Sequence, residues 1–134
     1  MNTKHIFLIL LVILTQALAA CGSAAPATDP AAVAQSFYKA VNEGDIDAAM
    51  ALVADDIKCR GGCYLDGIES FRAYIQGGIN GNGPTEISDL KVEGDTVTYN
   101  WAAYTKEGFL EARGVETLQI KDGKIILMES QAFQ

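Results

Sequence analysis

The second half of the chain alternates between apolar and polar residues, a pattern that suits a β-sheet and not a helix. From Thr85 onward four stretches follow this period of two, and short turns that pair carboxylates with glycines separate them. A carboxylate beside a glycine is typical of a tight hairpin turn. The predicted strands are residues 86–92, 96–105, 109–120 and 124–133. We therefore expect four consecutive strands joined by hairpins, which form an antiparallel meander.

The preceding part of the chain carries the period of amphipathic helices. Asp29-Pro30 predicts a helix start, because aspartate caps a helix and proline suits its first turn. Apolar residues then recur at helical spacing in three segments, which are residues 29–44, 45–56 and 68–78. Residues 57–66 predict a short strand and hairpin, and residues 80–84 predict a loop. Helices followed by strands indicate an α+β fold.

The first residues have the layout of a secretory leader. Lys4 and His5 precede an apolar run, and Leu18-Ala19-Ala20 stands directly before Cys21. This stretch resembles the lipobox of bacterial lipoproteins, whose cysteine is acylated and becomes the first mature residue. A transmembrane anchor is the alternative, but a span needs about 20 apolar residues. The run from Ile6 is shorter, because Thr15 and Gln16 interrupt it. An ordinary signal peptide followed by a chance cysteine is the other alternative.

This resemblance divides the chain into three parts. Residues 1–20 are a lipoprotein signal peptide, residues 21–28 are a lipidated Cys21 and a flexible tether, and residues 29–134 are one domain. We expect a lipid-anchored protein of the bacterial cell envelope outside the cytoplasm, with the membrane as a partner through Cys21. No aspartate follows Cys21, so the outer membrane is favoured where the host has two.

Charge and histidine content exclude several function classes. The chain carries a net charge of −7, and loss of the leader makes it more negative, because the leader holds Lys4 and no acidic residue. Such a chain repels phosphate backbones, so we expect no nucleic-acid partner. The only histidine, His5, leaves with the leader. Histidine-dependent nucleophilic catalysis is thereby excluded, and we expect no metal and no cofactor.

The order of elements resembles the nuclear transport factor 2-like superfamily, including the SnoaL-like proteins. Three stretches carry the resemblance: VAQSFYKAVNEGDIDAAMALVADD, DGIESFRAYI and IKDGKIILMES. It implies three N-terminal helices packed on a strongly curved, mainly antiparallel sheet that encloses a conical pocket. It also implies that a homodimer forms through the sheet. Known enzymes of this superfamily place acids, bases and tyrosines around the pocket.

The candidate catalytic residue is Glu116. In several of those enzymes the base is a carboxylate on the early strand, but the corresponding stretch here, residues 57–60, has none. Glu116 alternates with Leu118 and Ile120, so it can share their inward face, where desolvation would raise its pKa. The alternative, which the pattern favours, is that Glu116, like Glu111 and Arg113, lies in solvent or in a sheet dimer.

Aromatic side chains are the candidate ligand-binding residues. Tyr99 and Trp101 share one face of a central strand, and Tyr38 on the first helix can close the opposite side. Amphipathic rings of this kind commonly line ligand pockets, although ordinary core packing is the alternative for most of them. Cys59 and Cys63 flank Arg60-Gly61-Gly62 and predict a disulfide in an oxidising compartment, with a free thiol pair as the second possibility.

These features predict a binding or accessory module that holds a small apolar ligand or a protein partner. The lack of a mature histidine and of an early-strand carboxylate argues against an enzyme. Two alternatives stay open: a small pocket enzyme of the isomerase, cyclase or hydrolase type that uses Glu116 and a tyrosine, and a structural dimer whose pocket is filled by its own side chains.

Overall fold

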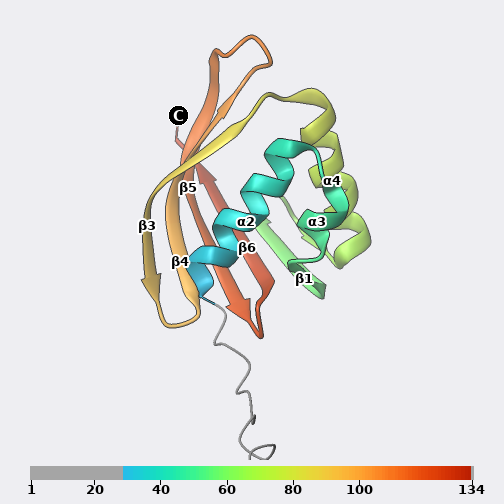
Figure 1. Cartoon of the computed structure of the whole chain (residues 1–134), viewed down its shortest axis with the longest axis vertical. Helices are drawn as coiled ribbons and strands as arrows, with labels where there is room; N and C mark the ends of the chain where they lie inside the picture. The colour runs from blue at the N-terminus through green and yellow to red at the C-terminus, as the bar shows by residue number, and fades with distance from the viewer. Residues whose placement is uncertain (1–28, 134) are drawn as a thin grey trace, which may run out of the picture.

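A computed structural model describes residues 29–133 of the chain and shows a layer of helices against one curved sheet (Figure 1). The leader and Cys21 lie outside the described residues. The helices are α2 (Pro30–Glu43), α3 (Ile46–Met50) and α4 (Ile68–Gly81). The strands are β1 (Val53–Gly61), β2 (Leu65–Asp66), β3 (Thr85–Glu93), β4 (Thr96–Tyr104), β5 (Leu110–Lys121) and β6 (Lys124–Ala132). Within the described part of the chain, no helix is long and apolar enough to cross a membrane.

The strands form a single sheet in the order β2-β1-β6-β5-β4-β3. Neighbours from β6 to β3 are antiparallel and confirm the predicted meander, while β1 runs parallel to β6. The sheet curves around α2, and α3 and α4 cover the same face beside β1 (Figure 1). The predicted α+β class, three helices on a strongly curved and mainly antiparallel sheet, is therefore confirmed.

Helix α2 forms where the sequence predicts it, and its ends show why. The Asp29 side chain accepts a hydrogen bond from the backbone N–H of Ala31 at 3.0 Å, and Pro30 occupies the first turn. Gly44 ends the helix in a left-handed conformation with φ 75°. The face that packs into the concave side of the sheet is fully apolar, and its buried residues are Val33, Ala34, Phe37 and Ala40.

The second helix was predicted too long, because the last residues assigned to it belong to a strand. Helix α3 ends at Met50, and Val53, which was expected on its apolar face, begins β1. Val53 pairs with Ile125 of β6, and this long-range contact decides the conformation against the local helical spacing. Asp55 and Asp56 consequently lie within β1, which corrects the expectation that the early strand carries no carboxylate. Both are exposed.

The end of the third helix is also shifted. Helix α4 continues to Gly81, past the predicted stop at Gly77-Gly78, so that the expected loop of residues 80–84 shortens. The chain then crosses from the helical layer to the far edge of the sheet and enters β3 (Figure 1).

Candidate functional site

A cavity of about 1260 Å³ lies between the helical layer and the concave face of the sheet. Its inner wall combines aromatic side chains with one carboxylate, and its outer part is formed by the C-terminal ends of α2 and α4 and by the β4–β5 hairpin. The inner lining residues are Phe37, Tyr38, Tyr74, Trp101, Glu116, Met128 and Ser130. A cavity of this size can hold a small organic molecule.

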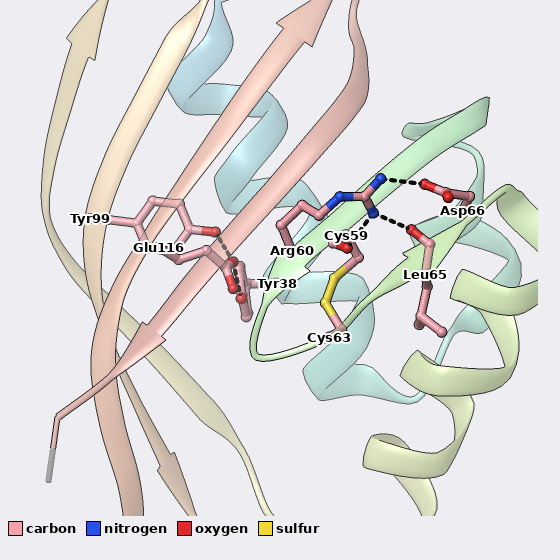
Figure 2. The surroundings of a disulfide bond; sticks show 8 residues. All are labelled: Tyr38, Cys59, Arg60, Cys63, Leu65, Asp66, Tyr99 and Glu116. Carbon is pink, nitrogen blue, oxygen red and sulfur yellow. Dashed lines mark hydrogen bonds and ion pairs between the residues drawn. A yellow bond between two sulfur atoms is a disulfide. The ribbon is translucent and has the colours of Figure 1, made fainter.

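Glu116 is the buried carboxylate of this cavity, with 5% of its surface exposed. Strand β5 places it directly opposite Tyr99 of β4, and the Tyr99 hydroxyl donates to Glu116 Oε1. Tyr38 of α2 approaches from the helical layer, and its hydroxyl donates to the same Oε1 at 2.5 Å. Figure 2 shows the hydroxyl groups of both tyrosines, one from α2 and one from β4, pointing at the carboxyl group. The expectation that Glu116 lies in solvent or at a sheet dimer is therefore wrong.

Burial dominates the electrostatics of this group. Desolvation raises the pKa of Glu116 above its ordinary value of 4.5, while hydrogen bonds from Tyr38, Tyr99 and Ser130 favour the carboxylate and partly oppose that rise. The pKa values of Tyr38 and Tyr99 are raised well above 10.0, first by burial and further by the nearby Glu116. Both phenols therefore stay protonated and remain donors at neutral pH. Glu116 is the group of this cluster that can exchange a proton.

The predicted aromatic residues take different places. Tyr38 and Trp101 line the cavity. Tyr99 is 1% exposed and contributes only through its hydroxyl on Glu116, because its ring packs edge-on against Tyr38 with ring centres 5.7 Å apart. The indole N–H of Trp101 is buried and has no hydrogen-bond partner among the described residues. An unpaired buried donor of this kind costs about 1–3 kcal/mol, which makes Trp101 an unsatisfied point in the cavity wall.

The other charged residues singled out on β5 do not join the cluster. Arg113 is exposed, and Glu111 is exposed at the outer part of the cavity. Tyr74 and Ser130 line the cavity but were not predicted as site residues. Tyr74 was one of several aromatic residues for which ordinary core packing was preferred, and Ser130 carried no local signal. No set of three or more histidine, cysteine, aspartate or glutamate side chains in residues 29–133 is arranged to hold a metal ion.

Cys59 and Cys63 lie at disulfide distance, with their Cα atoms 5.5 Å apart. The loop between them packs on β6, and Gly62 reaches the cavity wall. Arg60 braces this loop from outside: its guanidinium donates to the carbonyls of Cys59 and Leu65 and pairs with Asp66 at 2.7 Å (Figure 2). The cysteine pair thus fixes one wall of the cavity.

A helical layer and a curved sheet that enclose a cavity define the nuclear transport factor 2-like class of folds. The sequence profile of the SnoaL-like domain matches residues 34–128, and the chain belongs to this family. No curated protein matches the chain significantly in sequence.

Solved structures support the fold at low sequence identity. A nuclear transport factor 2-like protein of unknown function from Cytophaga hutchinsonii is 13% identical, with a TM-score of 0.69 over 81% of this chain and 94% of that one. An LEH-like epoxide hydrolase of Mycobacterium tuberculosis is 16% identical, with a TM-score of 0.68 over 78% of this chain and 82% of that one. Rv0760c of Mycobacterium tuberculosis, in complex with estradiol-17β-hemisuccinate, is 24% identical, with a TM-score of 0.64 over 75% and 92%.

Proposed function

We propose that this SnoaL-like domain binds a small amphipathic molecule in its cavity, with the polar group of that molecule against Glu116. One observation carries the proposal: an open cavity of about 1260 Å³ holds a single buried carboxylate on its inner wall. A structural domain would fill this volume with its own side chains, since protein interiors are close-packed. The cavity thus argues against the alternative of a purely structural dimer.

The walls indicate how the ligand is held. Phe37, Tyr38 and Trp101 offer apolar area, and burial contributes about 25 cal/mol per Å² before the costs of association are subtracted. Glu116 adds a polar contact that fixes orientation. Its partners Tyr38 and Tyr99 hold the carboxyl group in place, so the contact is preorganised.

Proton transfer by Glu116 is the second candidate function. The raised pKa of this buried carboxyl group makes it a stronger base than an exposed glutamate, and it lines the cavity where a substrate would lie. Such an enzyme would be of the isomerase, cyclase or hydrolase type, and the fold neighbour described as an epoxide hydrolase is consistent with hydrolysis. Turnover that depends on pH and disappears in Glu116→Gln would establish this candidate.

Ligand binding is tested with the intrinsic fluorescence of Trp101, the only tryptophan of the chain. A library of apolar and amphipathic small molecules should contain compounds that shift the emission of the wild-type domain. Glu116→Gln should weaken the binding of these compounds, whereas Glu111→Gln, a matched change at the exposed outer part of the cavity, should not. A Trp101 emission typical of full water exposure that no compound alters would overturn the proposal.

We also propose that the domain is anchored to a membrane of the cell envelope, outside the cytoplasm, by a lipid on Cys21. The support is the Leu18-Ala19-Ala20-Cys21 stretch. Labelling with a lipid precursor should mark the wild-type protein and not Cys21→Ser. Equal labelling of both proteins would refute the anchor.

A further inference from the structure

We infer that the cavity selects an organic cation, an amphipathic molecule that carries a protonated amine. This inference rests on the proposed function, because it names the chemical class of the molecule held at Glu116. Three features of the described residues carry it: the composition of the contacts around Glu116, the charges that line the cavity, and the arrangement of the aromatic rings.

The first feature is that Glu116 has only neutral partners. Its hydrogen bonds come from the hydroxyl groups of Tyr38, Tyr99 and Ser130, and no described lysine or arginine bonds to it. A buried carboxylate without a positive partner is costly, and buried charges in proteins are normally paired. A cation supplied by a ligand would complete the site with a charge-assisted hydrogen bond, which is about twice as strong as a neutral one.

The second feature is the sign of the remaining charges. Among the described lining residues, three are glutamates and one, Lys106, is basic. Lys106 is already engaged, because its ammonium group donates to the carbonyl of Asn80 at 2.7 Å and so ties the β4–β5 hairpin to α4. Glu43 is partly compensated by Lys39 at 3.4 Å, but Glu111 has no ion-pair partner among the described residues. The cavity therefore opposes anionic ligands and favours cations.

The third feature is the ring system beside the carboxylate. Tyr38 packs edge-on against Phe37, with ring centres 5.4 Å apart, and the pKa of Tyr74 on α4 is raised by burial and further by the charge of Glu116. Trp101 completes the wall on β4. Ring faces attract cations, most strongly that of tryptophan, and cages of aromatic rings are used in proteins to bind ammonium groups.

Three probes with one apolar body and different head groups test this inference. These are 1-aminoadamantane, which is an ammonium ion at neutral pH, 1-adamantanol, which is neutral, and 1-adamantanecarboxylate, which is an anion. Binding to the wild-type domain is measured by Trp101 fluorescence and by calorimetry. We expect the amine to bind roughly tenfold or more tightly than the alcohol, as an added charge-assisted contact implies, and the carboxylate to bind most weakly.

Variants assign the selectivity to the carboxylate. Glu116→Gln should bring the amine and the alcohol to similar affinities, whereas Glu111→Gln should keep most of the preference. If Glu116→Gln fails to fold, the pH dependence of the wild type replaces it. Affinity for the amine should then rise with pH as Glu116 ionises, since its neighbours Tyr38, Tyr74 and Tyr99 stay protonated, and affinity for the alcohol should not.

The outcomes separate this inference from the proposed function. Equal or tighter binding of the alcohol or the carboxylate would overturn the cation preference and leave a ligand-binding cavity in place. If neither the three probes nor any compound of the small-molecule library binds, the proposed function itself is overturned. A preference for the amine that survives Glu116→Gln would place the cation elsewhere and refute the role of this carboxylate.

Discussion

Replacing Tyr99 by phenylalanine removes one hydroxyl group and should make the stability of the domain depend more strongly on pH. Tyr99 is 1% exposed, and its hydroxyl donates to the buried Glu116. Phenylalanine keeps the ring and its edge-on contact with Tyr38. The variant therefore isolates a single hydrogen bond within the carboxyl cluster.

The magnitude follows from the charge of the acceptor. A hydrogen bond to an ionised group contributes about 1.5–3 kcal/mol, and one between neutral groups contributes about 0.5–1.5 kcal/mol. Burial raises the pKa of Glu116 in the folded state. The protonated carboxyl group therefore contributes its full stabilisation below the ordinary pKa of 4.5, and this stabilisation is lost as pH rises through the folded-state pKa. Without the Tyr99 donor that pKa rises further. The destabilisation should be smallest in acid and approach the upper range once Glu116 is ionised.

Urea unfolding followed by Trp101 fluorescence, at several values between about pH 4 and 9, measures this dependence. Tyr104→Phe is the matched control, because it also removes a tyrosine hydroxyl that donates to a glutamate, Glu86 at 3.2 Å, but at an exposed site where solvent weakens the contact, so its effect on stability should be much smaller at every pH. A Tyr99→Phe destabilisation that is the same at every pH would show that the hydroxyl does not act on a titrating carboxyl group and would refute the reasoning.

Three further predictions concern the frame of the cavity. Gly61→Ala should destabilise the domain by more than Gly94→Ala: both glycines have positive φ, which costs about 1–2 kcal/mol for alanine, but only the Gly61 side chain would meet a backbone oxygen, that of Ser130 at 2.0 Å. Equal unfolding free energies would contradict this. Joint replacement of Cys59 and Cys63 by alanine should cost about 2 kcal/mol, the low end expected for so short a loop, and mass spectrometry of non-reduced protein should show the bridged peptide. Two free thiols in protein taken from its native envelope would contradict the disulfide. The domain without its leader should form a dimer through the outer face of the sheet. Light scattering at tens of micromolar measures this, and a monomer would contradict the prediction.

Local patterns were sufficient to predict the meander but not the facing of Glu116. Its alternation with Leu118 and Ile120 allowed a shared inward face, and all three are buried, yet the sequence favoured a position in solvent or at a sheet dimer for Glu116. The alternation alone does not show whether the free-energy cost of burying a glutamate is compensated. An inward glutamate is unfavourable unless polar partners meet it, and those partners come from another strand and from a helix far away in the chain.

The partnership between Tyr99 and Glu116 depends on an irregularity that leaves no local signal. The β4–β5 ladder pairs Tyr104 with Leu110 and then shifts register by one residue. Counting from that first pair without the shift would set Tyr99 opposite Val115, which faces the other side of the sheet. A bulge changes every later pairing, and nothing in the hairpin sequence announces it.

The start of β1 was predicted wrongly for a related reason. Val53 continues the helical spacing of Ile46, Ala49 and Met50, so local reasoning extended the helix through it. Its actual partner, Ile125, lies near the end of the chain and pairs with it in parallel. Parallel pairing needs a long crossover, so no turn between the two segments can reveal it.

The direction of α2 sets how far the cavity lies from the end of the domain that the proposed lipid would anchor. The α2 residues that line the cavity, from Phe37 onward, belong to its C-terminal half, whereas the chain enters the helix at Pro30, and 14 helical residues span about 20 Å. A lipid on Cys21, as proposed, would attach the domain by the end at which α2 begins. The outer part of the cavity, at the C-terminal ends of α2 and α4, would then lie farther from the attachment point. A molecule that reaches Glu116 through this outer part would enter from water, which suits a water-soluble amine better than a molecule extracted from the membrane.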